Sequence, residues 1–256
     1  MASQTIPTAV DRLLAVLGGD PFADFPFRDH ISDLQGWVDE GSILFDAIEK
    51  LQPEVIVEVG TWKGSSAIAM AKRMKMLNLP GRVVCVDTWL GGIEHMLENA
   101  SQANWLQSRH GHPGIYAQFL ANVMHAGVED LIVPVPQTSH IAARLFNHLG
   151  VRPNLVYLDA SHDALDVSID LALYWDMLQD GGILVGDDYT FYWPGVVTAA
   201  QRFARQYGRP IFSRFGQFVF FKGDNALAQI CKSAETTCWD PVHRRDVPIP
   251  PEIQVT

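Results

Sequence analysis

A strand that breaks through two glycines into a helix constrains the fold of this chain more than any other feature. Residues 55–57 (Val-Ile-Val) have the apolar character of a buried strand, and residues 65–72 read as the start of a helix. Gly60 and Gly64 lie between them. Glycine lets a ligand approach the main chain closely, and the first N–H groups of the helix are open to bind it. The stretch therefore predicts a ligand-binding turn.

A second apolar run, residues 83–86, ends in Asp87. In α/β proteins an acidic side chain at this place suits the hydroxyl groups of a ribose. Together with the glycine turn, Asp87 predicts an α/β domain that binds a nucleoside.

The pattern of apolar runs predicts the fold class. Strands are expected near 54–59, 83–87, 131–135, 154–159 and 182–186, alternating with helices near 64–77, 115–126, 139–149, 164–178 and 195–207. Such alternation predicts parallel strands with right-handed crossovers. Two further strands, near 210–213 and 217–222, form a hairpin around Gly216. We therefore expect a doubly wound α/β fold with a mostly parallel seven-stranded sheet and one antiparallel edge strand.

Flanking segments divide the chain further. Residues 1–50 are expected to be a helical appendage, residues 51–223 the main domain, and residues 224–256 a polar, Pro-rich tail, draped or mobile. The aromatic residues of the appendage, Phe22, Phe25 and Phe27, either pack onto the main domain or form part of a lid. Residues 90–114 are an insertion without clear periodicity.

Composition excludes several classes of partner. The chain has 256 residues, 48% of them hydrophobic, and a formal net charge of -10. This charge makes a nucleic-acid backbone an unfavourable partner. No apolar stretch approaches 18 residues, and residues 1–5 do not resemble a signal peptide. We expect no nucleic-acid or membrane partner, and a homo-oligomer is compatible with the sequence.

The three cysteines are scattered at Cys85, Cys231 and Cys238. They form neither a CxxC pair nor a disulfide framework, which makes a reducing cytoplasm the expected compartment. A Cys231–Cys238 bridge is the alternative.

Polar side chains follow five of the expected strands. They are Glu58, Asp87, Gln137-Thr138-Ser139, Asp159 and Asp187-Asp188. Ligands of open α/β sheets bind at the carboxyl ends of the strands, so these residues are candidates for a shared site. Each alone also has a structural explanation, such as capping a turn or a helix.

Three carboxylates in one crevice would repel one another. Two charges about 4 Å apart cost roughly 4 kcal/mol at an effective dielectric constant of about 20. Protonation or a divalent cation relieves this cost, and oxygen ligands favour Mg²⁺, Mn²⁺ or Ca²⁺. Asp159, Asp187 and Asp188 are therefore candidate metal ligands. The alternative is that Asp188 faces outward or caps a turn.

His162 follows Asp159 by three positions. A histidine titrates near neutrality and can accept a hydroxyl proton, which makes His162 a candidate base. It could instead orient Asp159 or hydrogen-bond the loop.

These motifs resemble those of class I S-adenosylmethionine-dependent methyltransferases, and among them the metal-dependent O-methyltransferases. The resemblance covers roughly residues 40 to 223. The stretches 159–163 and 181–189 are similar to the branch that contains macrolide-sugar O-methyltransferases and cephalosporin-biosynthesis proteins.

The resemblance implies a Rossmann-like methyltransferase fold, a role for each motif, and metal-assisted O-methylation of a sugar or small natural product. Asp159, Asp187 and Asp188 would bind Mg²⁺, Mn²⁺ or Ca²⁺, and His162 stands where catechol-type relatives have a lysine base. S-adenosylmethionine would be bound by Glu58, Gly60, Thr61, Gly64, Ser65, Asp87, Thr88, Trp89, Thr138, Ser139 and Asp159. The alternatives are an S-adenosylmethionine-binding protein without turnover and a nicotinamide-dependent oxidoreductase. Trp62 argues against the oxidoreductase, because that class needs a glycine at this place.

Overall fold

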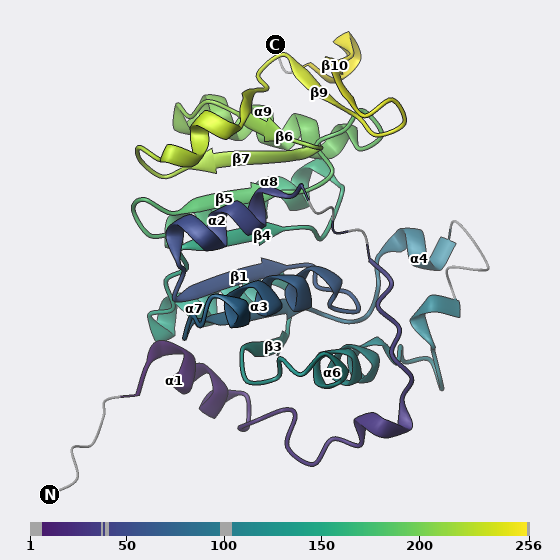
Figure 1. The fold of residues 1–256 in the computed structure, drawn as a ribbon. Helices are drawn as coiled ribbons and strands as arrows, with labels where there is room; N and C mark the ends of the chain where they lie inside the picture. Colours follow the sequence, from purple (N-terminus) through teal and green to yellow (C-terminus); the bar gives the residue numbers. More distant parts are fainter. Residues whose placement is uncertain (1–6, 37, 39–40, 98–103, 255–256) are drawn as a thin grey trace, which may run out of the picture.

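An eight-stranded sheet forms the centre of the computed structural model, which describes residues 7–36, 38, 41–97 and 104–254 (Figure 1). Its strand order is β3-β2-β1-β4-β5-β7-β6-β8. The strands are β1 Val55–Val59, β2 Arg82–Asp87, β3 Ile132–Pro136, β4 Leu155–Leu158, β5 Ile183–Gly186, β6 Phe212–Arg214, β7 Gln217–Phe221 and β8 Lys232–Ser233. Strands β1 to β5 pair in parallel with one another. Strand β7 is antiparallel to its two neighbours, β5 and β6, and β8 is antiparallel to β6.

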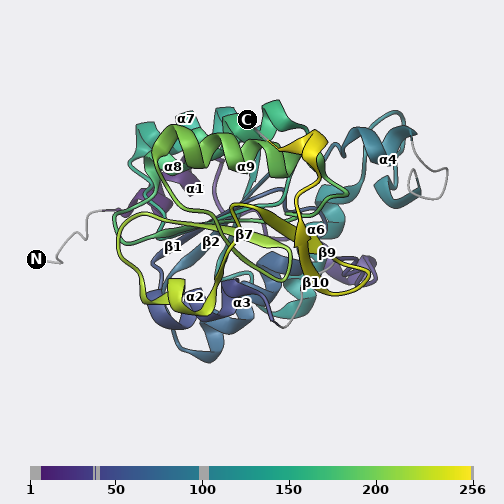
Figure 2. The same ribbon diagram turned by 90° about the horizontal axis from the view of Figure 1, so that it is seen from above.

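Helices cover both faces of the sheet and give a three-layer α/β/α arrangement (Figure 2). One face carries α1 Ala9–Val16, α7 Ser139–Leu149, α8 Ala164–Met177 and α9 Pro194–Tyr207, and the other carries α2 Ile43–Leu51, α3 Ser65–Met76 and α6 Ile115–Ala126. The strands are rich in Val and Ile and buried on both sides, as parallel strands between two helical layers must be. In β1, Val57 and Val59 pack into one layer and Ile56 into the other.

The expected fold class is confirmed. All seven expected strands and the five helices of the main domain form near their predicted positions. The antiparallel strand β7 lies between β5 and β6, and β8 adds an eighth strand beside β6.

The tail forms more regular structure than the sequence analysis expects. It contributes β8, the 3₁₀ turns at Ala226–Ile230 and Pro251–Ile253, and a hairpin of β9 Thr237–Asp240 with β10 Arg245–Pro248. The hairpin attaches to the chain after β5, since the Trp239 amide donates to the Tyr189 carbonyl at 2.9 Å. The Tyr189 hydroxyl in turn donates to the Ala234 carbonyl at 3.0 Å.

The N-terminal residues pack onto the main domain. Helix α1 lies against α7, and α2 lies against α3. Phe22 is buried in the same apolar cluster as α2, which supports packing for the aromatic segment that includes the 3₁₀ turn Phe27–Asp29.

The insertion contains a short helix, α4 Ile93–Leu97, and a 3₁₀ turn at Asn104–Leu106, while its residues 98–103 lie outside the described residues, as do residues 1–5. No helix in the described part of the chain is both long and apolar enough to cross a membrane. All three cysteines are free thiols, so the alternative of a Cys231–Cys238 bridge is not realised.

Asp170 on α8 gives the fold a testable dependence on pH. Burial raises the pKa of Asp170 from 3.8 to about 6, an effect that the Ser139 side chain opposes by hydrogen bonding. Because the folded state disfavours the ionised form, the free energy of unfolding falls as pH rises through the interval between these values. The loss is at most about 3 kcal/mol.

We predict that Asp170→Asn is more stable than the wild type at pH 7.5 and that this advantage shrinks toward pH 4. Urea unfolding at both pH values measures it, with Asp176→Asn on the exposed side of the same helix as the control. An advantage that does not change with pH would contradict the prediction.

Candidate active site

The turn after β1 is fixed by close contact with the end of β4. Gly60 has φ 86°, and a Cβ there would lie 2.0 Å from the Asp159 carbonyl oxygen. Gly64 has φ 90°, and a Cβ there would lie 2.9 Å from the Phe119 ring. Both positions need glycine for conformation and for space. The turn that the sequence predicts is therefore placed directly beside Asp159.

Asp87 holds this turn through its carboxylate. One oxygen accepts from the amides of Thr61 (2.9 Å) and Trp62 (2.8 Å), and the other accepts from the Trp89 amide (2.7 Å). Burial raises the pKa of Asp87, and these three hydrogen bonds oppose the rise. Asp87 thus organises the glycine turn, a role that the sequence analysis does not assign to it.

Buried polar atoms lie around the turn. Burial raises the pKa of Glu58 to about 7, although the Ser66 hydroxyl donates a hydrogen bond to one of its oxygens. The other Glu58 oxygen, Thr61 Oγ1 and Trp62 Nε1 are buried without a hydrogen-bond partner among the described residues. Unpaired buried polar atoms are costly, so this region fits a polar ligand that completes their hydrogen bonds.

A segment of the N-terminal region, residues 30–36, crosses the start of α3, and we call it the strap. Lys63 is 2% exposed and donates to Asp33 of the strap at 2.5 Å. Asn122 on α6 bonds the Asp33 amide and carbonyl and the Lys63 carbonyl. At its end, a Cβ on Gly36 would lie 2.2 Å from Ser65 Cβ. The strap therefore covers the N-terminus of α3.

The remaining residues expected to bind a nucleoside are spread more widely. Trp89 is 2% exposed, packs against Tyr116 and Phe119, and donates from Nε1 to the Trp62 carbonyl at 2.8 Å. The Trp89 ring therefore supports the glycine turn from the core of the protein. Thr88 is exposed, and Thr138 is the exposed N-cap of α7, followed by Ser139.

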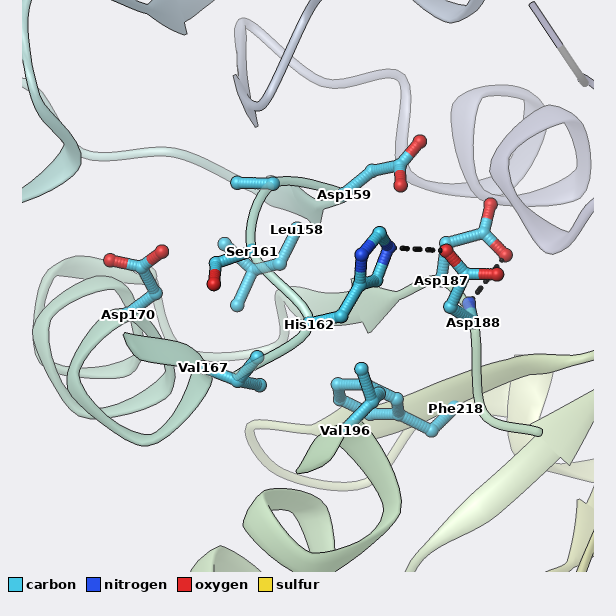
Figure 3. A pocket seen from close by; sticks show the side chains of 11 residues that line it. Leu158, Asp159, Ser161, His162, Val167, Asp170, Asp187, Asp188, Val196 and Phe218 are labelled. Carbon is cyan, nitrogen blue, oxygen red and sulfur yellow. Dashed lines mark hydrogen bonds and ion pairs between the residues drawn. The ribbon is translucent and has the colours of Figure 1, made fainter. Parts of the chain in front are cut away.

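Four polar side chains converge where β4 and β5 end (Figure 3). His162 Nε2 lies 2.9 Å from Asp188 Oδ2. One ligand atom from each of Asp159, His162 and Asp188 lies within 4.8 Å of the others. Asp188 has φ 58°, so the chain turns directly after Asp187. The close approach of Asp159 and Asp188 that the sequence predicts is therefore present.

Asp187 has a further set of partners, one of which, the Tyr157 hydroxyl, also lies 3.3 Å from Asp159 Oδ2. One of its oxygens accepts from the Asp188 amide at 2.8 Å. The other accepts from the Tyr157 hydroxyl and, at 3.5 Å, from the Gln217 side chain. The structure thus brings Asp159 and Asp188 together with His162, and Asp187 is not part of that group.

The sequence analysis does not single out Tyr157 or Gln217. Tyr157 stands two residues before Asp159, and strand alternation places both side chains on one face, so the signal is present in the sequence. Gln217 comes from the neighbouring antiparallel strand β7 and carries no local signal.

Electrostatic repulsion strains this cluster. Burial, together with the negative charges of Asp187 and Asp188, raises the pKa of Asp159 well above its usual range. Burial and the charge of Asp188 also raise the pKa of Asp187. No Lys or Arg among the described residues forms an ion pair with any of the three aspartates. In the described part of the chain, the aspartates therefore have no lysine or arginine to balance their charge.

Aromatic residues surround one side of the cluster. Trp193 stacks on His162 with ring centroids 3.8 Å apart, and Tyr192 beside it is 53% exposed. Trp175 and Tyr189 are buried in the apolar core. Trp193 and Tyr192 are thus available to a ligand at the cluster, whereas Trp175 and Tyr189 support the fold.

Comparisons with known proteins give a consistent result. A family model described as a methyltransferase domain matches residues 57–189. No curated protein sequence matches the chain.

Solved structures resemble the fold at low identity. An O-methyltransferase from Bacillus cereus in complex with SAH is 15% identical, with a TM-score of 0.50 over 86% of this chain and 94% of that chain. The O-methyltransferase TomG from Streptomyces achromogenes, involved in tomaymycin synthesis and bound to SAM, is 19% identical, with a TM-score of 0.50 over 87% and 100%. The calicheamicin methyltransferase CalS11 is 20% identical, with a TM-score of 0.54 over 84% and 92%. At these identities the similarity establishes the fold.

We predict that Gly60→Ala destabilises the protein far more than Gly181→Ala. Gly181 has φ 79° with nothing within 4 Å of an added Cβ, so its substitution costs only the left-handed conformation, about 1 to 2 kcal/mol. At Gly60 the added methyl also meets backbone that cannot move aside. Denaturant unfolding compares the two variants, and equal losses would show that the contact with Asp159 does not constrain the turn.

Proposed function

The chain belongs to the methyltransferase-domain family, and on this premise we propose that it transfers the methyl group of S-adenosylmethionine to a hydroxyl oxygen of a small molecule with the help of a divalent cation. The observation that carries the proposal is the contact between Gly60 and Asp159. This contact places the glycine turn, which suits the methyl donor, next to the acidic cluster, which suits a cation and a hydroxyl group. The matched family segment, residues 57–189, contains both.

The donor is proposed to lie along the glycine turn. Gly60, Thr61, Gly64 and Ser65, with Glu58 beneath them, would border its methionine part, and Asp159 would stand at the transferring methyl group. Thr88, Thr138 and Ser139 would lie along the nucleoside, and Asp87 and Trp89 would hold the turn behind it. The unpartnered buried atoms of Glu58 and Thr61 support a polar ligand here. When bound, the donor supplies a methyl group on a positively charged sulfur.

The acidic cluster fits a divalent cation. Its three closest ligand atoms are within 4.8 Å of one another, and no described Lys or Arg neutralises the aspartates. Asp159 and Asp188 are the proposed ligands from the expected set. Asp187, the third expected ligand, adds its negative charge beside them. When bound, a divalent cation lowers the pKa of a coordinated hydroxyl group and fixes its orientation.

The chain's own residues perform the rest of the reaction. His162, held between Trp193 and Asp188, borders the place proposed for the acceptor hydroxyl. A site that holds the acceptor oxygen in line with the methyl group lowers the barrier, because the two reactants no longer have to find this alignment by diffusion. The strap covers the start of α3 and limits the access of water to the donor.

The proposed acceptor is a hydroxylated small natural product or sugar. TomG takes part in tomaymycin synthesis and CalS11 is a calicheamicin methyltransferase, and both resemble this fold. The exposed Tyr192 and the stacked Trp193 offer aromatic surface next to the cluster for such an acceptor.

We predict that Asp159→Ala abolishes the metal-stimulated part of methyl transfer while S-adenosylmethionine still binds. The variant removes a cation ligand but leaves the glycine turn, whose contact is with the Asp159 backbone. Transfer assays with and without Mg²⁺ and Mn²⁺, beside calorimetric titration of the donor, measure both properties. Metal-stimulated activity equal to that of the wild type would refute the role of Asp159.

We also predict that methyl transfer to a panel of hydroxylated sugars and phenolic natural products requires a divalent cation. Treatment with EDTA should abolish turnover, and added Mn²⁺ or Mg²⁺ should restore it. Donor binding without transfer to any acceptor would favour a binding protein of the same fold.

A further inference from the structure

The cation site differs in one ligand from the set of three aspartates that the sequence suggests. We propose that the third ligand is His162 Nε2, so that Asp159, His162 and Asp188 form a mixed nitrogen and oxygen site for a first-row transition metal such as Mn²⁺. This inference rests on the divalent cation of the proposed function and names its protein ligands and its class of metal.

Geometry supports His162 as a member of the set. The candidate ligand atoms of Asp159, His162 and Asp188 are mutually within 4.8 Å. Ligand atoms bound at about 2.1 Å to one octahedral ion lie roughly 3 to 4.2 Å apart. A small inward movement of these side chains therefore suffices to coordinate one ion. Figure 3 shows the imidazole of His162 below the carboxylate of Asp159 and beside that of Asp188.

The oxygens of Asp187 are engaged by other partners, although Asp187 lies next to Asp159 through the shared Tyr157 hydroxyl. Its two oxygens are engaged by the Asp188 amide on one side and by Tyr157 and Gln217 on the other. Gln217 cannot easily turn its amide round, because its oxygen accepts from the Ser42 hydroxyl at 2.9 Å and from the Ile43 amide at 3.2 Å. The N–H groups of Gln217 therefore stay directed toward Asp187.

The contact between His162 and Asp188 is also compatible with metal ligation. Nε2 lies 2.9 Å from a carboxylate oxygen, and two lone pairs cannot face each other at that distance without a positive charge or a proton between them. A proton shared between the two atoms satisfies this contact. In the same place a cation can bind both atoms, and Nε2 then has no free lone pair with which to accept the acceptor's proton.

An imidazole ligand changes the expected metal preference. Mg²⁺ and Ca²⁺ bind almost entirely through oxygen, whereas Mn²⁺ and the later divalent metals also accept imidazole. Two carboxylates and one imidazole leave coordination positions for the acceptor oxygen and water. We therefore expect this site to bind Mn²⁺ more tightly than Mg²⁺.

The test measures Mn²⁺ binding to the full chain without donor or acceptor, so its outcome does not depend on methyl transfer. Electron spin echo spectroscopy of bound Mn²⁺ should show modulation from a directly coordinated nitrogen, and His162→Gln should remove it. The same variant should weaken Mn²⁺ binding in calorimetric titrations by at least about tenfold, since loss of even an outer partner of a ligand costs that much. His148→Gln, an exposed position on α7, is the control.

Two further variants separate the aspartates. Asp187→Asn and Asp188→Asn remove one charge each, but only the second replaces a proposed carboxylate ligand by a weaker, neutral amide oxygen, so Asp188→Asn should weaken Mn²⁺ binding more. In transfer assays, high Mn²⁺ should partly restore His162→Gln, whereas a lost base would not be restored. Absence of Mn²⁺ binding, absence of nitrogen modulation in the wild type, or a greater loss in Asp187→Asn would overturn the inference. Failure of methyl transfer with this binding intact would instead count against the proposed function.

Discussion

Negative charge gathered at the ends of β4 and β5 is the constraint on which the rest of the site depends. Asp159 and Asp188, with Asp187 beside them, lie in a half-buried region without a lysine or arginine partner among the described residues. The fold tolerates them through protonation, through the Tyr157 hydroxyl and through the imidazole of His162. A bound cation and a positively charged sulfur nearby would stabilise the same arrangement in the working protein. The repulsion in the ligand-free chain thus favours binding of positive charge.

Segments far apart in the sequence meet to hold this arrangement. Gln217 on β7 connects the N-terminus of α2, through Ser42, to Asp187. The tail hairpin fixes the chain just after Asp188 by bonding Tyr189. On the donor side, the strap is bound to Lys63 within the glycine turn. The N-terminal residues and the tail are therefore parts of the support of the candidate site.

The sequence predicts the sheet and helices well because their burial follows simple periodicities. Residues 55–57 and 83–86 are continuous apolar runs, and the glycine turn between strand and helix admits few other interpretations. The tail strands escape prediction because β8 has two exposed residues and β10 includes a proline, and such edges form through pairing partners supplied by the rest of the fold. Short strands of this kind have no amphipathic pattern of their own.

Within the site, the sequence identifies which residues are present better than it identifies where their side chains point. Asp159, His162 and Asp188 are each recognisable, but whether Asp187 or His162 completes the cluster depends on Tyr157 and on Gln217, which belong to different strands. Asp87 is expected to face a ligand, yet it bonds three backbone amides, a result that only the tertiary structure reveals.

Anomalous diffraction from crystals grown with Mn²⁺ and S-adenosylhomocysteine tests the central claim most directly. The account predicts one strong peak between Asp159, His162 and Asp188, with the sulfur of the nucleoside facing it from the glycine turn. A nucleoside bound elsewhere, or no metal peak within reach of these three side chains, would contradict it.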